Sequence, residues 1–238
     1  MSVRRLLLAV VLACVLAPAA AQDRAVDAER RVRPALEADL AAAGLRYGAP
    51  LLLRIFKAES ELEVWVRDGA RYRRFRTYPI CTYSGTLGPK TRQGDHQAPE
   101  GFYTVAAGQL NPASRYHLSF DLGYPNAFDR AHGRTGDYLM VHGDCVSIGC
   151  YAMGDAAIEQ IYTLVAAALR GGQRRVDVHA FPFRFDAPPR RDWRAGEWGA
   201  FWSELEPAYF AVERTGRLPA VRVVDGHYRV APPGGATP

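Results

Sequence analysis

Apolar and polar residues alternate along three successive stretches in the first half of the chain, Leu51–Phe56, Glu61–Arg67 and Tyr72–Tyr83. Alternation with a period of two is typical of β-strands that bury one face. Asp68-Gly69 separates the second stretch from the third, and this dipeptide favours a tight hairpin turn. The pattern therefore predicts a meander of antiparallel strands.

Shorter strands are predicted further along the chain. Phe102–Ala106, Tyr116–Phe120 and Val176–Ala180 alternate in the same way, and Tyr138–Val141 is a short apolar strand that leads into His142. Residues 84–101 are polar and rich in glycine and proline, which predicts a loop. Because this loop exceeds the usual limit of about 12 to 15 residues, a functional role is indicated.

Helical periodicity marks three segments, Arg30–Gly44, Asp155–Arg170 and Trp198–Arg214. The middle segment has the clearest boundaries, because Asp155 favours a helix start and Gly171-Gly172 favours a helix end. A hairpin across Asp225-Gly226 is predicted after the third helix.

The first 21 residues have the organisation of a secretory signal peptide. Two arginines precede the apolar run Leu6–Leu16, which is too short to span a bilayer, and Ala19–Ala21 form a cleavage site of small residues. The exported chain is expected to begin at Gln22, with no transmembrane segment after cleavage. The alternative is a lipoprotein box, Val11–Cys14, with an acylated cysteine. Because the apolar run continues past that cysteine to the cleavage site, we favour the signal peptide.

Composition and charge narrow the class of protein. The chain of 238 residues is 48% hydrophobic and 23% charged, as in ordinary globular proteins. A formal net charge of +5 indicates a weakly basic surface. No block of lysine and arginine is interleaved with aromatic residues, so a nucleic-acid partner is not expected.

One segment, Leu139–Met153, brings His142, Cys145 and Cys150 close together in the sequence. A cysteine attacks carbonyl groups as a thiolate, and a nearby histidine can take its proton. The cluster could also hold a disulfide or a zinc ion. Because the short Cys-x-x-Cys pairs typical of zinc sites are missing, we expect no metal and no cofactor.

The residues of this segment resemble the catalytic signature of the YkuD-type L,D-transpeptidases. In that family a strand ends in Ile-His-Gly, and a later Ser-His-Gly-Cys-Ile-Arg-Met carries the nucleophile. The matching residues here are His142-Gly143 and Ser147-x-Gly149-Cys150-Tyr151-x-Met153. Lys90–Tyr103 resembles the family's Thr-Pro-x-Gly-x-Phe element, and Ser84–Lys90 and Tyr124–Gly133 resemble the YafK-like subgroup.

This resemblance implies a fold that is mainly β with flanking helices (α+β), namely a mixed β-sandwich. The predicted meander and the helix after the motif agree with it. The expected divisions are a signal peptide (1–21), an N-terminal helical segment (22–48), the YkuD-type catalytic domain (49–185), a C-terminal helix and hairpin extension (186–230) and a disordered tail (231–238).

The resemblance also implies roles for the residues of the motif. Cys150 is expected to be the nucleophile and His142 the general base that then protonates the leaving amine. The carbonyl of Gly143 would orient the imidazole, and the N–H groups of Gly149 and Cys150 would form the oxyanion hole. Ser147 matches the motif serine, and a hydroxyl that stabilises the turn is an equally good interpretation.

For activity, the resemblance implies attack on a bond formed by meso-diaminopimelate in peptidoglycan stem peptides, in the periplasm. Ile148 replaces a histidine of the family pattern and Ala152 an arginine or asparagine, and only about seven residues separate His142 from Cys150. These departures favour water or a different acceptor. The YafK-like subgroup implies amidase-like hydrolysis of the link between diaminopimelate and the C-terminal lysine of an outer-membrane lipoprotein. The alternatives are a transpeptidase that cross-links stems or attaches proteins, and a non-catalytic peptidoglycan-binding domain.

Without the signal peptide, three cysteines remain in an oxidising compartment, which implies one disulfide and one remaining thiol. We expect Cys145 to pair with Cys81 and Cys150 to stay free. Two alternatives remain open: Cys145 as the nucleophile, and a Cys145–Cys150 bond that gates activity by redox state.

Four polar residues before the motif are candidates for substrate binding: Asn126, Asp129, Arg130 and Arg134. They could hold the carboxylates and the amine of diaminopimelate through charge-assisted hydrogen bonds. Stabilisation of their own loop is the other interpretation.

Overall fold

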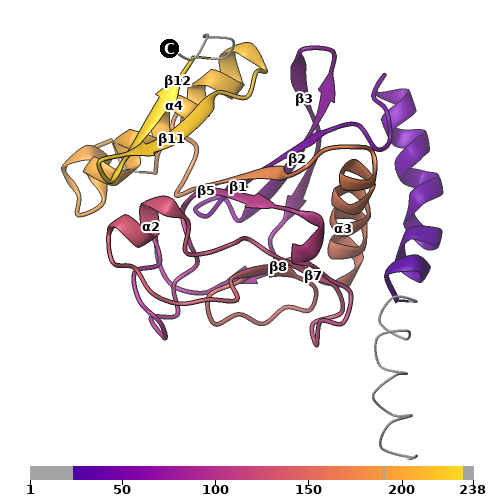
Figure 1. The fold of residues 1–238 in the computed structure, drawn as a ribbon, viewed down its shortest axis with the longest axis horizontal. Helices are drawn as coiled ribbons and strands as arrows, with labels where there is room; N and C mark the ends of the chain where they lie inside the picture. The colour runs from indigo at the N-terminus through magenta and orange to yellow at the C-terminus, as the bar shows by residue number, and fades with distance from the viewer. Residues whose placement is uncertain (1–23, 190, 233–238) are drawn as a thin grey trace, which may run out of the picture.

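The computed structural model describes residues 24–189 and 191–232, and its two main sheets share one apolar core (Figure 1). The predicted signal peptide lies outside the described residues, and so do residues 233–238 of the predicted tail. Ala231, the first residue of that tail, ends the last strand instead. Within the described ranges, no helix is long and apolar enough to cross a membrane.

The first sheet contains the predicted meander, and its strands lie in the order β3-β2-β1-β10-β5. The bounds are Leu51–Phe56 for β1, Glu61–Asp68 for β2, Arg71–Pro79 for β3, Gly101–Val105 for β5 and Val176–Phe181 for β10. As the alternation and the Asp68-Gly69 turn predict, β1 pairs with β2 and β2 with β3 in antiparallel register. β10 returns the chain to this sheet and lies parallel to β1.

The second sheet carries the histidine and cysteine motif on short strands in the order β4-β9-β8-β7-β6. The bounds are Thr82–Tyr83 for β4, Leu110–Asn111 for β6, Ser119–Asp121 for β7, Met140–His142 for β8 and Tyr151–Ala152 for β9. β8 is antiparallel to β7 and parallel to β9. The two-residue strands β6 and β9 escaped sequence-based prediction, because alternation has no meaning over two residues.

Two predicted strands are shorter in the structure. The stretch Tyr72–Tyr83 divides around Ile80 and Cys81, because the chain passes there from the first sheet to the second. The stretch Tyr116–Phe120 joins the sheet only at Ser119. His117 has a φ of 66°, a left-handed conformation that interrupts a strand.

Helices flank the two sheets. α3 (Asp155–Arg170) packs on the shared core, and an N-terminal helix over residues 24–42, which begins ahead of the predicted Arg30, lies beside it (Figure 1). Arg31 of this helix pairs with Glu159 of α3 at 2.5 Å. The connections contain the short helix α2 (Ala127–Ala131) and the 3-10 turns η1 (Ala107–Gln109) and η2 (Trp193–Ala195).

The C-terminal extension covers the outer face of the first sheet. It consists of α4 (Gly199–Thr215) and a hairpin of β11 (Ala220–Val224) and β12 (His227–Ala231). Because side chains alternate along β1, Leu53 lies in the shared core, whereas Phe56 lies in an aromatic cluster with Trp202 of α4 and Tyr228 of β12. The aromatic-rich C-terminal sequence therefore packs against the sheet.

A buried ion pair links this extension to the long loop. The side chains of Lys57 and Glu100 are fully buried, with 3.0 Å between Nζ and Oε1. Lys57 also donates to the carbonyls of Gly88 and Ala98. Glu100 accepts hydrogen bonds from the N–H of Gly88 and from Nε1 of Trp202. The pair thereby fixes the loop between the first sheet and α4.

Candidate active site

Parallel pairing of β8 and β9 brings the predicted nucleophile and base to one face of the second sheet. The register sets His142 beside Ala152. Two residues earlier, Met140 lies beside Cys150, and the Met140 N–H donates to Sγ at 3.4 Å. Since side chains two positions apart in a strand share a face, His142 and Cys150 extend from the same side of the sheet.

His142 is oriented by the backbone of the next residue. Its side chain is buried, and Nδ1 lies 2.5 Å from the carbonyl oxygen of Gly143. Because a carbonyl only accepts hydrogen bonds, Nδ1 carries the proton and the neutral ring keeps a lone pair at Nε2. This is the orienting contact that the family resemblance implies. Burial lowers the pKa of His142 below the ordinary 6.5, although the Gly143 carbonyl and the charge of Asp144 act in the other direction.

Only glycine fits at position 143. A Cβ atom there would lie 2.6 Å from Oδ1 of Asp155 and 2.7 Å from the carbonyl oxygen of Tyr116. The Gly143 N–H donates to the carbonyls of Tyr116 and Leu118, each at 3.0 Å. Gly143, whose carbonyl orients the imidazole, is therefore confined between the start of α3 and the segment before β7.

Cys150 is half-buried and is the free cysteine of the described part of the chain. Besides accepting from Met140, its thiol donates to the carbonyl of Tyr138 over 3.7 Å. Burial raises the pKa of the thiol above the ordinary 9.0. Asp121 raises that pKa further, whereas the Met140 N–H and Lys90 lower it. At rest, a neutral thiol and a neutral imidazole are favoured over a thiolate–imidazolium pair.

The lowered pKa of His142 and the raised pKa of Cys150 together predict how an activity that uses both residues depends on pH. The competent state has a neutral His142 to take a proton and a protonated Cys150 to supply one. We therefore expect kcat/KM to rise with pH through an apparent pKa below 6.5 and to fall through one above 9.0. Initial rates measured across this range check it, and an acid limb above 6.5 would contradict it.

Ser147 closes the turn before the nucleophile. Its Oγ donates to the carbonyl of Cys150 at 2.8 Å and accepts the N–H of Gly149 at 3.2 Å. These bonds favour the turn-stabilising interpretation of Ser147. They also occupy the Gly149 N–H, so of the two expected oxyanion donors only the Cys150 N–H has no hydrogen-bond partner within the described residues.

Cys81 and Cys145 form a disulfide bond, as predicted. Cys81 directly precedes β4, and Cys145 lies in the loop between His142 and Cys150. Because the sulfur of Cys145 is already bonded, Cys145 is not available in this structure as nucleophile, as a partner of Cys150 or as a zinc ligand. The bond ties the loop over the candidate site to the edge of the second sheet.

Removal of this bond is expected to destabilise the fold. The two cysteines are 64 residues apart in sequence, so the bond greatly restricts the unfolded chain. We expect Cys81→Ser/Cys145→Ser to lose about 2–4 kcal/mol of unfolding free energy, measured by urea denaturation. Wild-type protein treated with dithiothreitol should unfold at the same urea concentration as the variant. Equal midpoints for the variant and the oxidised wild type would refute the prediction.

Exposed apolar side chains occur in the two segments next to Cys150, namely the turn that precedes it and the segment whose carbonyl accepts its thiol hydrogen bond. Tyr138, Val146 and Ile148 are 71%, 50% and 75% exposed, and all three belong to the segments next to Cys150. We call these three residues the apolar rim. Ala152, in contrast, is fully buried beside His142, so this departure from the family pattern changes packing and not the exposed surface.

The four candidate substrate-binding residues all have partners inside the protein. The side chain of Asn126 caps α2 by accepting the N–H of Asp129. Asp129 is fully buried and pairs with Arg134 at 2.8 Å. Arg130 donates to the backbone carbonyl of Pro125. These contacts favour the interpretation that the four residues stabilise their own loop. Their binding of a substrate carboxylate stays a prediction.

Tyr116 is a site residue that the sequence did not reveal. Its ring lies over the imidazole of His142, with 4.7 Å between centroids and 30° between planes. Only the pairing of β7 with β8, which sets Ser119 opposite His142, brings this distant segment to the site. No local pattern around Tyr116 signals the contact.

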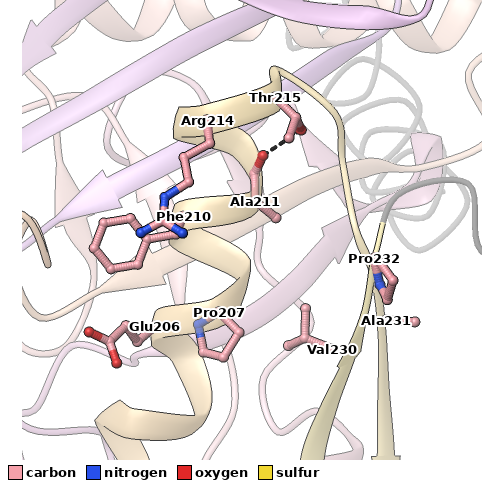
Figure 2. Close-up of a pocket in the computed structure, with 9 residues that line it drawn as sticks. All are labelled: Glu206, Pro207, Phe210, Ala211, Arg214, Thr215, Val230, Ala231 and Pro232. Carbon is pink, nitrogen blue, oxygen red and sulfur yellow. Dashed lines mark hydrogen bonds between the residues drawn. The ribbon is translucent and has the colours of Figure 1, made fainter.

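A separate hollow lies in the C-terminal extension, between α4 and the end of β12 (Figure 2). It measures about 590 Å³ and is lined by Glu206, Pro207, Phe210, Ala211, Arg214, Thr215, Val230, Ala231 and Pro232. The Arg214 guanidinium lies over the ring of Phe210, 4.5 Å from its centroid. Since no residue in contact with Cys150 or His142 lines it, the hollow is not part of the candidate active site.

Comparison with known protein families identifies the family of the chain. Residues 52–178, more than half of the sequence, match the family described as YkuD, L,D-transpeptidase catalytic domain. The chain belongs to this family. The match includes the central strands of both sheets and the whole motif from His142 to Cys150. The YkuD family assignment and the mainly β fold with flanking helices are therefore confirmed, and the domain is of a kind that acts on peptidoglycan.

Individual relatives agree with the family. The chain is 47% identical over 186 residues to the L,D-transpeptidase YafK of Escherichia coli (strain K12), a name given provisionally, and the match covers 78% of this chain and 76% of that protein. YafK of Escherichia coli O157:H7 gives the same values.

Among solved structures, the helical cell shape determining protein Pgp2 of Campylobacter jejuni is 20% identical, with a TM-score of 0.47 over 70% of this chain and 59% of that chain. Bd1075 of Bdellovibrio bacteriovorus is 22% identical, with a TM-score of 0.40 over 57% and 49%. The chain thus covers less than two thirds of either solved structure.

Proposed function

We propose that this protein is a periplasmic cysteine acyl-transfer enzyme that hydrolyses the bond between meso-diaminopimelate of peptidoglycan and the terminal lysine of an outer-membrane lipoprotein. One observation carries the proposal: the free thiol of Cys150 and the Gly143-oriented imidazole of His142 extend from the same face of paired strands. Membership of the L,D-transpeptidase family supplies the substrate class.

In the proposed reaction, the side chain of Cys150 rotates from Met140 and Tyr138 towards His142. Nε2 of His142 takes the thiol proton while Sγ attacks the carbonyl carbon of the scissile amide. The oxyanion that forms accepts the Cys150 N–H. As the C–N bond breaks, His142 returns the proton to the leaving lysine amine and a thioester remains. Water then attacks the thioester carbonyl while His142 takes a proton from it. As the C–S bond breaks, His142 gives this proton to Sγ, which restores the thiol and the neutral imidazole, and the new carboxyl group of diaminopimelate is released and ionises.

Features of the loop support hydrolysis of a protein substrate. The loop between His142 and Cys150 is short and is held by the disulfide of Cys145. We expect a short, tethered loop to leave the thioester accessible to water. The apolar rim offers exposed surface for the protein side of the substrate. Transpeptidation remains the alternative, because the same thioester can pass to an amine.

The product distinguishes the candidate functions. Purified protein is incubated with sacculi that carry covalently bound lipoprotein, and the products are analysed by mass spectrometry beside a Cys150→Ala control. Hydrolysis predicts free lipoprotein that ends in lysine and stem peptides that end in diaminopimelate. New cross-linked stems or stems joined to added amines indicate transpeptidation. Binding to the sacculi with no product from either protein indicates a non-catalytic domain and overturns the proposal.

A further inference from the structure

The backbone segment just before β7 lies directly over the candidate base. Tyr116 covers one face of the His142 imidazole, and its carbonyl accepts the N–H of Gly143 at 3.0 Å. The carbonyl of Gly143 in turn accepts from Nδ1 of His142. Tyr116 therefore contacts His142 through its ring and also holds Gly143, the residue whose carbonyl orients the imidazole.

The N-terminal helix holds this segment in place. Ser114 and His117 lie on either side of Tyr116 in the sequence. Nη1 of Arg24 donates to their carbonyls, at 2.9 Å and 2.8 Å respectively. His117 adopts the positive φ that non-glycine residues disfavour. The imidazole of His117 contacts Glu159 at 2.7 Å, and Glu159 also pairs with Arg31 of the helix. Two arginines of one helix thus stabilise a strained segment.

The helix over residues 24–42 lies outside residues 52–178, which match the family. A segment that the family match does not include is consequently connected to the candidate base by hydrogen bonds and short stretches of backbone. The connection runs from Arg24 through the carbonyls around Tyr116 to Gly143 and His142.

We propose that the N-terminal helix is a working part of the active site, in which Arg24 fixes the Ser114–His117 segment so that Tyr116 acts as a positioning residue that shields His142 from water. The inference rests on the proposed role of His142 as general base. Exclusion of water from one face of the imidazole destabilises its charged form and lowers its pKa. The neutral ring therefore remains a proton acceptor at lower pH.

The other groups around the imidazole define what Tyr116 adds. Asp144, in the loop after β8, raises the pKa of His142, and burial lowers it with the larger effect. Asp155 of α3 accepts the backbone N–H of Asp144. Cys150 directly precedes β9, the strand paired with β8, and its thiol contacts backbone groups of Met140 and Tyr138. Removal of the Tyr116 ring admits water to the shielded face and raises the pKa of His142.

The test follows the titration of His142 directly by NMR of ring-labelled histidine, together with the pH profile of kcat/KM. Tyr116→Ala and Arg24→Ala are expected to move the acid limb and the NMR midpoint upward by about 0.5 to 1 pH unit. Tyr116→Phe, which keeps the ring, should leave both in place. Arg30→Ala is the matched control, because Arg30 is exposed and contacts only Asp27 of its own helix within the described residues.

The outcomes separate this inference from the proposed function. A His142 titration in Arg24→Ala that equals that of Arg30→Ala overturns the inference, whatever the activity. Full activity of Cys150→Ala would instead overturn the proposed function, while the NMR titration could still show the effect of Tyr116. A thermal melt of each variant confirms that the fold is intact, and a shift in Tyr116→Ala without one in Tyr116→Phe shows that the ring is responsible.

Discussion

Replacement of Cys150 by alanine is expected to lower kcat/KM for release of lipoprotein from peptidoglycan by roughly 10⁴-fold or more. The proposed mechanism has no other nucleophile, because Cys145 is held in the disulfide with Cys81. The side chain is half-buried, and its hydrogen bonds to described residues are with backbone groups of Met140 and Tyr138, so its loss should leave the fold intact. Rates measured with purified protein, with circular dichroism to verify folding, check this prediction.

The disulfide variant Cys81→Ser/Cys145→Ser is the matched control, because it removes two cysteines and keeps the thiol of Cys150. It should retain measurable activity at a temperature below its unfolding transition. If Cys150→Ala were active and this control inactive, the nucleophile would have been assigned to the wrong cysteine.

Lys57→Met is expected to lower the free energy of unfolding by about 3–5 kcal/mol, the largest effect on stability that we predict for a single replacement. Lys57 and Glu100 are both fully buried. Loss of the ammonium leaves the Glu100 carboxylate without its counter-charge and deprives the carbonyls of Gly88 and Ala98 of their donor. Urea denaturation followed by tryptophan fluorescence measures the change.

Two further variants show whether the buried charge is responsible. Lys57→Met/Glu100→Leu removes both charges and should recover part of the loss, since no unpaired carboxylate remains. Arg73→Met breaks an exposed pair with Asp68 and should cost less than about 1 kcal/mol. A loss below about 1 kcal/mol in Lys57→Met as well would contradict the prediction.

The parts of the fold that could be predicted from sequence are those with local signals. The meander over β1 to β3, the helix α3 and the helix α4 each have a periodicity and boundary residues that are visible within a few positions. The two-residue strands β6 and β9 form only because pairing places them next to a neighbouring strand. Sequence patterns contain no such information over two residues.

The residues of the candidate site also fall into those that a local sequence pattern indicates and those that only the structure reveals. His142 and Cys150 lie close together in sequence and carry a motif, so the sequence indicated both. Tyr116 and Arg24 reach the site through antiparallel pairing and the packing of the N-terminal helix, which only the three-dimensional structure reveals. For Ser147, two interpretations were open, and the hydrogen bonds to Cys150 and Gly149 favour the structural one.

The aromatic cluster beneath the C-terminal extension limits how the chain can be shortened. Phe56 and Phe181 belong to strands at the centre of the first sheet, yet their rings pack against Tyr209 of α4, in the same cluster as Trp202. A truncation after residue 185 would retain the whole family match and still leave these rings facing solvent. We expect such a fragment to aggregate rather than to behave as a minimal enzyme, so the smallest independently folding unit of this protein is larger than its recognisable catalytic domain.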